Sequence, residues 1–226
     1  MDKLVYVAVA LPAIIIALSL HEFGHAAMAT KMGDPTPRLQ GRLTLNPLAH
    51  LDPMGTLFII FTLLLGFGFG WGKPVQTNPA YYTNYRQGRI LVAVAGPAMN
   101  LVQAMFAVGV AYLLFTSHAG LSVLILLFLQ SYIVINIVLM LFNLFPLPPL
   151  DGGHVAEMLL PWHLRDQFRR LAPMGLLIVL GLLWFTPLFG LIINGFLTGM
   201  AWLLQLGFGT EFVRYMGMAH YLGLPM

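Results

Sequence analysis

The segment His21-Glu22-Phe23-Gly24-His25 has the residue types and the spacing of an HExxH zinc motif. On a helix, His21 and His25 lie four positions apart on one face, so both imidazoles can bind one Zn²⁺ ion. Glu22 lies one position around the helix, where its carboxylate can accept a proton from water and later deliver it to a leaving amine. Because zinc polarises a scissile carbonyl and activates water, the motif predicts metal-assisted hydrolysis with Glu22 as the general base.

The motif lies within an apolar run, Val5–Thr30, that is long enough to span a membrane. The chain of 226 residues is 59% hydrophobic and 8% charged, and its mean hydropathy is +0.84. This composition excludes an ordinary soluble domain and predicts a polytopic membrane protein. The first run is too long for a cleavable signal peptide and carries the metal motif, so we expect it to remain in the protein. The absence of cysteine leaves His, Asp and Glu as the strong zinc ligands.

The remaining apolar runs are separated by loops rich in Pro, Gly, Asn and Tyr. We expect an all-α fold that forms a single membrane-embedded domain over residues 1–226. Its catalytic core is expected at about 5–160, followed by a C-terminal helical hairpin at about 171–206. The further apolar runs are Leu57–Gly70, Ile90–Thr116, Leu121–Phe145, Leu171–Phe185 and Leu188–Leu206.

A third zinc ligand is expected at the same membrane depth, and the best candidate is Asp151. Three prolines between Phe145 and Asp151 disrupt helical geometry, and the two glycines that follow permit a tight backbone that turns the carboxylate toward a metal. Irregular backbone at membrane depth must be buried in protein or line a watery cavity. The alternatives are that Asp151 is a solvated helix cap, or that His154 or Glu157 supplies the third ligand.

The number of membrane crossings decides whether Asp151 can reach the two histidines. The histidines lie six to ten residues before Lys31, roughly 9–15 Å from that helix end, whereas Asp151 follows the end of another helix. An even number of crossings must therefore separate Lys31 from Phe145, yet three apolar runs lie between them. The shortest, Leu57–Gly70, ends in a glycine-rich stretch and is expected to form a re-entrant or interfacial element instead of a span.

The distribution of positive charge supports this arrangement. If Leu57–Gly70 does not cross, ten of the eleven Lys and Arg residues share one side and only Lys3 lies opposite; if it crosses, the split is eight against three. The positive-inside rule makes the crowded side cytoplasmic, with the amino terminus outside and the active site near the cytoplasmic surface of the cell membrane. We expect five full spans plus one re-entrant element, with six spans as the alternative. The ten residues are Lys31, Arg38, Arg42, Lys73, Arg86, Arg89, Arg165, Arg169, Arg170 and Arg214.

Two loops are expected to lie near the active site, where the fold is expected to contain a short re-entrant or β-hairpin element. Gly41–Asn46 has the alternation of a short strand, and Gly72–Gln87 has the composition of an extended segment. A protease acts on an extended peptide, so an edge strand near the zinc could capture a locally unwound substrate by strand addition.

Polar residues within the apolar runs have several possible uses. Asn143 precedes Asp151 by eight residues in apolar sequence, so its amide must find a partner in another helix or in a substrate. Asn100 and Gly96 are expected to serve helix packing, because a small residue lets helices approach closely.

These residues together resemble the site-2 protease family of intramembrane zinc metallopeptidases, in its compact form without a PDZ domain. The resemblance covers most of the first 160 residues. One departure is His154, where many relatives have arginine after the Asp-Gly-Gly sequence. The resemblance rests on the HExxH motif and on the segments 41–53, 72–75, 95–100 and 143–153.

The resemblance implies that His21, His25 and Asp151 bind one Zn²⁺ ion per chain. It also implies that Glu22 is the general base and that Asn143 lies near the metal, where it contacts substrate or an oxyanion. The implied substrates are single-span regulatory membrane proteins, often already trimmed by another protease, as in regulated intramembrane proteolysis. Membrane lipid surrounds such an enzyme, no nucleic acid is expected, and the oligomeric state is left open. The non-enzymatic alternative is a metal-binding membrane transporter or scaffold without hydrolysis.

Overall fold

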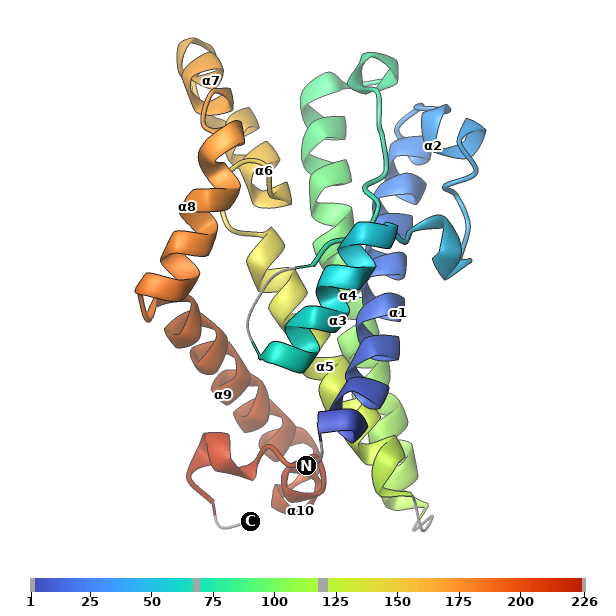
Figure 1. The fold of residues 1–226 in the computed structure, drawn as a ribbon, viewed down its shortest axis with the longest axis vertical. Coiled ribbons are helices and arrows are strands. Elements are labelled where there is room, and N and C mark those ends of the chain that lie inside the picture. The colour runs from blue at the N-terminus through green and yellow to red at the C-terminus, as the bar shows by residue number, and fades with distance from the viewer. Residues whose placement is uncertain (1–2, 67–69, 118–121, 225–226) are drawn as a thin grey trace.

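The structure is a computed structural model that describes residues 3–66, 70–117 and 122–224. Within these ranges the chain forms helices joined by loops, with 77% of the structure helical and no sheet. The predicted class, an all-α polytopic membrane protein, is therefore confirmed. Figure 1 shows that the helices lie along the long axis of the molecule and that both ends of the described chain lie at the same end of it.

Among the described residues, four helices are long and apolar enough to cross a membrane: α1 (Lys3–Lys31), α4 (Tyr85–Thr116), α5 (Val123–Asn143) and α9 (Leu188–Phe208). Helices α5 and α9, with 21 residues each, extend about 31 Å and so match the roughly 30 Å hydrocarbon core. Two further apolar helices are shorter, α3 (Pro53–Leu65) with 13 residues and α8 (Ala172–Phe185) with 14. These six helices correspond to the six predicted apolar runs.

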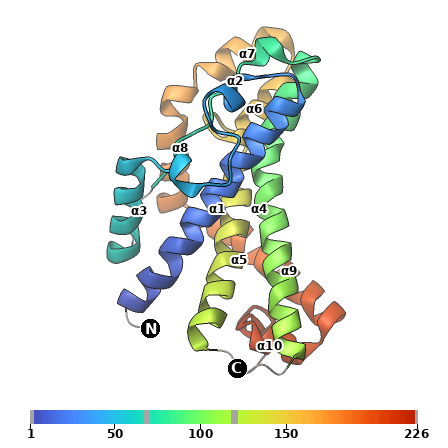
Figure 2. The same cartoon turned by 90° about the vertical axis from the view of Figure 1, so that its right-hand side faces the viewer.

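Small side chains let α1, α4 and α5 pack against one another at the centre of the molecule (Figure 2). Ala13 and Ala17 of α1, together with Ala107 and Ala111 of α4, are at most 2% exposed. Larger side chains of α5, such as Ile133, fill the space beside them in the same hydrophobic cluster. This three-helix contact fixes α1, which carries the HExxH motif, against α4.

The chain from Leu51 to Gly72, which contains α3, begins and ends at the same place in the molecule. The Asp52 carboxylate caps the helix by accepting a hydrogen bond from the Gly55 N–H at 2.7 Å, and Gly66 ends it in the left-handed region with φ +81°. Residues 67–69 of the expected re-entrant element lie outside the described residues. The chain then forms an antiparallel bridge between Leu51 and Gly72. Because its two ends meet, the segment forms a hairpin and not a membrane crossing.

The expected strand at Gly41–Asn46 is wrong, since no named strand occurs in the described ranges. Arg42 is buried, and its guanidinium donates hydrogen bonds to the carbonyls of Ala49, Lys73 and Pro74. This side chain supplies donors that a neighbouring strand would otherwise provide. The expected extended segment is formed by residues 72–78, and it ends where short helical turns lead into α4. The short helices of this region are α2 (Thr36–Leu39), η1 (Pro47–Ala49) and η2 (Pro79–Tyr81).

After α5, the chain breaks and forms two short helices, α6 (Asp151–Leu159) and α7 (Trp162–Arg169). Helix α6 packs against α4. Both short helices lie at the end of the molecule where α1 finishes and α4 begins (Figure 1). The first residue of α6 is thereby brought toward the second half of α1.

The expected C-terminal hairpin at 171–206 is not formed, because α8 and α9 run one after the other in the same direction (Figures 1 and 2). Their junction, Thr186 and Pro187, has no residue in the left-handed conformation of the kind that ends α3 at Gly66. Helix α9 leads to α10 (Thr210–Tyr215) and η3 (Ala219–Leu222) at the end that holds both termini.

This course of the chain corrects the predicted position of Arg214. Phe212 and Tyr215 of α10 pack their rings against Phe115, one residue before the end of α4, with centroids 5.7 and 5.1 Å apart. Arg214 therefore lies at the same end as Lys3, and the predicted charge split of ten against one becomes nine against two. Most of the positive charge therefore still lies at one end of the molecule, and the predicted orientation in the membrane keeps its basis.

Candidate metal centre

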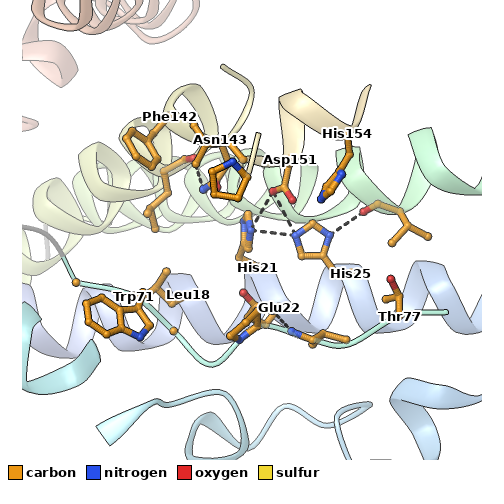
Figure 3. Close-up of a pocket in the computed structure, with 18 residues that line it drawn as sticks. Leu18, His21, Glu22, His25, Trp71, Thr77, Phe142, Asn143, Asp151 and His154 are labelled. Atoms are coloured by element: carbon orange, nitrogen blue, oxygen red, sulfur yellow. Dashed lines mark hydrogen bonds and ion pairs between the residues drawn. The ribbon is translucent and has the colours of Figure 1, made fainter. Parts of the chain in front are cut away.

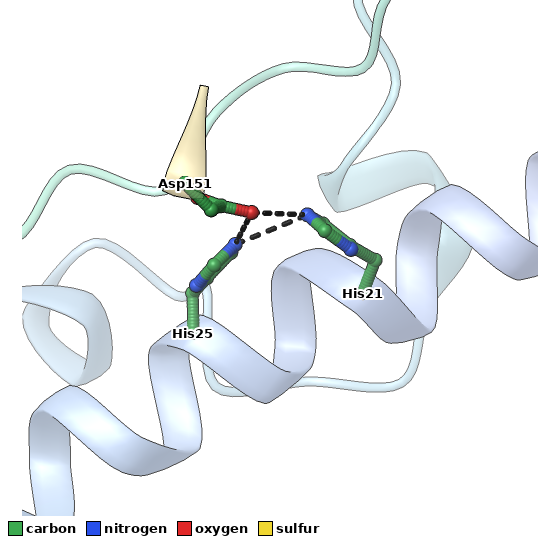
Figure 4. A group of neighbouring side chains, drawn as sticks. All are labelled: His21, His25 and Asp151. Carbon is green, nitrogen blue, oxygen red and sulfur yellow. Dashed lines mark hydrogen bonds and ion pairs between the residues drawn. The ribbon is translucent and has the colours of Figure 1, made fainter. Parts of the chain in front are cut away.

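The structure brings His21, His25 and Asp151 together, as the sequence predicted. The two histidine Nε2 atoms are 3.1 Å apart, and each lies 3.3 Å from Asp151 Oδ2. The histidines project from one face of α1, and Asp151 approaches from the first turn of α6 (Figure 4). Three potential metal-ligating atoms thus converge from two helices that are distant in the sequence.

The hydrogen-bond partners of the histidines leave all three converging atoms as acceptors. His25 Nδ1 lies 2.7 Å from the Val92 carbonyl oxygen, which can only accept, so Nδ1 carries the proton and Nε2 presents a lone pair. His21 Nδ1 lies 2.6 Å from Asn100 Oδ1, an amide oxygen that also accepts, so its Nε2 presents a lone pair as well. Asp151 Oδ2 is buried and, in the described structure, has no hydrogen-bond partner. Three acceptors that face one another require a cation, and two imidazoles with one carboxylate fit zinc.

The electrostatics of Asp151 suit a metal ligand. Burial alone would raise the pKa of Asp151, but the short contacts and charge interactions with His21 and His25 hold this pKa well below its usual range. The group therefore remains a carboxylate at neutral pH, which is the form that binds a metal.

Two glycines allow Asp151 to reach this position. A Cβ atom at Gly152 would collide with the carbonyls of Leu144 and Phe145, and one at Gly153 would collide with the backbone at Pro148. The chain that leaves α5 therefore folds tightly over the start of α6, as the Pro and Gly content predicted.

Helix α4 supplies contacts that sequence analysis assigned to packing alone. Gly96 lies against the imidazoles, since a Cβ atom there would collide with His25 Nε2 and with the His21 ring. Val92, Gly96 and Asn100 are spaced by four residues and share one face of α4. This spacing is visible in the sequence. Together with the packing of α4 on α1, it could have identified these three residues as neighbours of the histidines.

Glu22 lies in the same cavity but is not one of the three converging groups (Figure 3). Its Oε2 atom accepts a hydrogen bond of 2.7 Å from the Val75 N–H. The extended segment that contains Val75 is itself held in place, because the Lys73 N–H donates to the His50 carbonyl at 2.8 Å and Arg42 donates to the Lys73 and Pro74 carbonyls. The carboxylate is thus oriented by a backbone that is itself fixed.

A cavity of about 430 Å³ surrounds these residues. Its walls come from α1, from residues 70–77 after α3, from α4, from the end of α5 and from the start of α6 (Figure 3). Asn143 lines it, and the Asn143 Nδ2 atom donates a hydrogen bond of 2.9 Å to the Leu139 carbonyl one turn earlier. The apolar part of the wall includes Leu18, Trp71, Val75, Val92, Leu139 and Phe142.

Glu157 is engaged elsewhere, which disfavours it as the third metal ligand. Its buried carboxylate forms ion pairs with Arg89 at 3.0 Å and Arg169 at 2.7 Å. His154 lines the cavity, and its Nδ1 lies 3.3 Å from the same Arg89 guanidinium. Burial and the positive charge of Arg89 lower the pKa of His154. In the described residues, the metal-ligating group contains neither of these side chains.

The zinc-peptidase motif lies in a helix of membrane length, and an aspartate that follows a break in the chain after another such helix lies beside it. This is the arrangement of a membrane metallopeptidase. The chain belongs to Peptidase family M50, the site-2 protease family, whose family model matches residues 9–125 and 116–185. It is a zinc metalloendopeptidase and a membrane protein. No PDZ domain was found in the chain.

Similar proteins of this family occur in bacteria. "Putative zinc metalloprotease YwhC" of Bacillus subtilis (strain 168) is 38% identical over 200 residues, which cover 83% of this chain and 87% of that protein. "Putative zinc metalloprotease Rip2" of Mycobacterium tuberculosis (strain ATCC 25618 / H37Rv) is 36% identical over 201 residues, which cover 85% of this chain and 71% of that protein. No solved structure matches the chain.

Proposed function

We propose that this protein hydrolyses a peptide bond within or near a transmembrane segment of a membrane-anchored regulatory protein. The observation that carries the proposal is the convergence of His21, His25 and Asp151 beside Glu22, in a cavity between helices of membrane length. Such a site can act on a peptide that enters from the membrane, because the motif lies within the span α1 and not in an extramembrane loop.

The residues of the cavity have separate roles in this proposal. His21, His25 and Asp151 hold one zinc ion per chain, which when bound polarises the scissile carbonyl and activates water. Glu22 accepts a proton from the attacking water and delivers it to the leaving amine. Asn143 lies on the cavity wall, where it can contact the substrate backbone.

The extended segment at residues 72–78 provides a backbone that an extended substrate could pair with. Val75 and Thr77 line the cavity, and among the described residues the Gln76 N–H has no hydrogen-bond partner. A peptide could pair with this backbone by strand addition beside Glu22. The Val75 N–H is unsuitable for testing this pairing because it already orients Glu22. Proline at Gln76 removes the free donor together with the side chain that accepts a hydrogen bond from Gln40 Nε2 at 3.2 Å, so Gln76→Ala is the matched control. We expect slower cleavage in Gln76→Pro than in Gln76→Ala, with unchanged zinc content in both.

The charge distribution supports an active site near the cytoplasmic side of the cell membrane. Nine of the eleven basic residues lie toward the end of the molecule where α1 finishes, and Lys3 and Arg214 lie at the other. By the positive-inside rule, the amino terminus is outside.

The enzyme acts as a single membrane-embedded peptidase domain on a transmembrane substrate that another protease has already trimmed.

The experiment compares wild type, Glu22→Gln and Asp151→Ala in liposomes, with zinc content and cleavage of a synthetic single-span substrate measured for each. We expect Glu22→Gln to keep about one zinc per chain and lose cleavage, and Asp151→Ala to lose both. Full zinc content in Asp151→Ala would overturn the ligand assignment. Full function in Glu22→Gln would favour a metal-binding transporter or scaffold.

A further inference from the structure

We propose that Asn100 and Asn136 are positioning residues that hold His21 in the tautomer able to bind the metal. This inference rests on the proposed zinc site but not on the identity of the substrate. Both side chains are fully buried, with 0% exposure, between α1, α4 and α5. They form a chain of hydrogen bonds that ends on His21.

The direction of this chain is fixed at its far end. Asn136 Nδ2 donates to the Tyr132 backbone carbonyl at 2.9 Å, and a carbonyl can only accept. The other Asn136 atom, Oδ1, must therefore face Asn100, and it accepts from Asn100 Nδ2 at 2.8 Å. Asn100 consequently presents Oδ1 to His21 Nδ1 at 2.6 Å. The proton of His21 must then reside on Nδ1, which leaves the Nε2 lone pair directed toward His25 and Asp151.

The two metal-site histidines differ in how their tautomers are set. His25 faces the Val92 backbone carbonyl, which has no alternative hydrogen-bonding role. His21 faces a side-chain amide, and a free amide could rotate and present its NH₂ group instead. That rotation would place the His21 proton on Nε2, where it would point at the metal position and prevent ligation. Asn136 removes this freedom from Asn100, which explains a second buried amide on an apolar helix.

A neighbouring hydrogen-bond network provides a matched control. Gln103 follows Asn100 by three residues on α4, and its Oε1 atom accepts from the Tyr132 hydroxyl of α5 at 2.5 Å. Gln103 Nε2 donates to the Ala17 carbonyl of α1 at 3.4 Å. This network joins the same three helices without touching a metal-site histidine, and it shares Tyr132 with the chain that ends on His21. Gln103→Leu therefore measures the cost of losing interhelical polar contacts while the Asn100 contact to His21 is kept.

The experiment measures the zinc Kd by chelator competition in detergent for Asn100→Leu, Asn136→Leu, the double variant, Asn100→Asp and Gln103→Leu. Loss of a partner that orients a metal-binding histidine typically weakens metal binding about 10- to 100-fold, and we expect this for Asn100→Leu. Asn136→Leu is expected to weaken binding in the same direction, and the double variant no further than Asn100→Leu, because Asn136 acts through Asn100. Asn100→Asp keeps an acceptor for His21 but loses the donor to Asn136 Oδ1. It should therefore bind zinc within about threefold of wild type while its Tm falls.

Thermal stability and the visible spectrum of the cobalt-substituted protein complete the test. Gln103→Leu should lower the Tm but leave the zinc Kd and the cobalt spectrum unchanged, whereas Asn100→Leu should alter both metal readouts. Equal weakening of zinc binding by Gln103→Leu and Asn100→Leu would show a structural network only and overturn the proposal. An unchanged zinc Kd in Asn100→Leu would also overturn it. Absence of cleavage in every variant would count against the proposed substrate and leave the zinc result intact.

Discussion

The close approach of Gly96 to the imidazoles makes a single methyl group a sharp probe of the metal centre. A Cβ atom in Gly96→Ala would collide with His25 Nε2 and with the His21 ring, and these side chains are enclosed by α1, α4 and α6. Inserting a methyl group into a packed site costs typically about 1–3 kcal/mol. If that cost falls on the metal-bound arrangement, zinc should bind about 5- to 150-fold more weakly, since about 1.4 kcal/mol is tenfold in Kd.

Gly109→Ala is the matched control for this substitution. Gly109 lies on the same helix, and a Cβ atom there meets nothing within 4 Å. Chelator competition in detergent should therefore give a wild-type zinc Kd for Gly109→Ala and a weakened one for Gly96→Ala. A wild-type Kd in Gly96→Ala would refute the inference that α4 shapes the space around the two histidines.

Three further predictions concern the surroundings of the metal site. Removing zinc with a chelator should abolish cleavage, and adding zinc back should restore it; cleavage that persists in fully zinc-free protein would contradict a metal-dependent reaction. Arg89→Ala should lower the Tm more than Arg169→Ala, because the side chain of Arg89 is 21% exposed and that of Arg169 is 55% exposed, so loss of Arg89 leaves the buried Glu157 less compensated. The pKa of His154 is lowered in the folded protein, so unfolding takes up a proton and stability should fall as the pH drops below about 6.5. His154→Gln should flatten the Tm profile below about pH 6.5, and a profile identical to that of the wild type would contradict this.

Local sequence rules predicted the parts of the site that depend on one helix. The four-residue spacing of His21 and His25 places both imidazoles on one face wherever α1 packs. The Pro and Gly residues around Asp151 predicted the break after α5 because their backbone preferences are intrinsic. The count of crossings then predicted that Asp151 could reach the histidines, and this required the α3 segment to turn back, as it does.

Predictions that required knowing which segments pair or pack with one another were less successful. The strand expected at Gly41–Asn46 fails because Arg42 supplies the loop hydrogen bonds in place of a strand. The hairpin expected at 171–206 fails because apolar length alone does not specify the direction in which a helix leaves its junction. Arg214 was consequently placed at the wrong end.

Residue types and their spacing were enough to predict the chemistry: an HExxH helix, an aspartate after a broken helix, and spans long enough for a membrane. How other side chains complete the site became visible in the folded molecule. Asn100 comes 79 residues after His21, and no local periodicity shows that its amide oxygen meets that imidazole. Side-chain contacts between helices depend on the rotation and depth at which the helices pack, which are properties of the whole bundle.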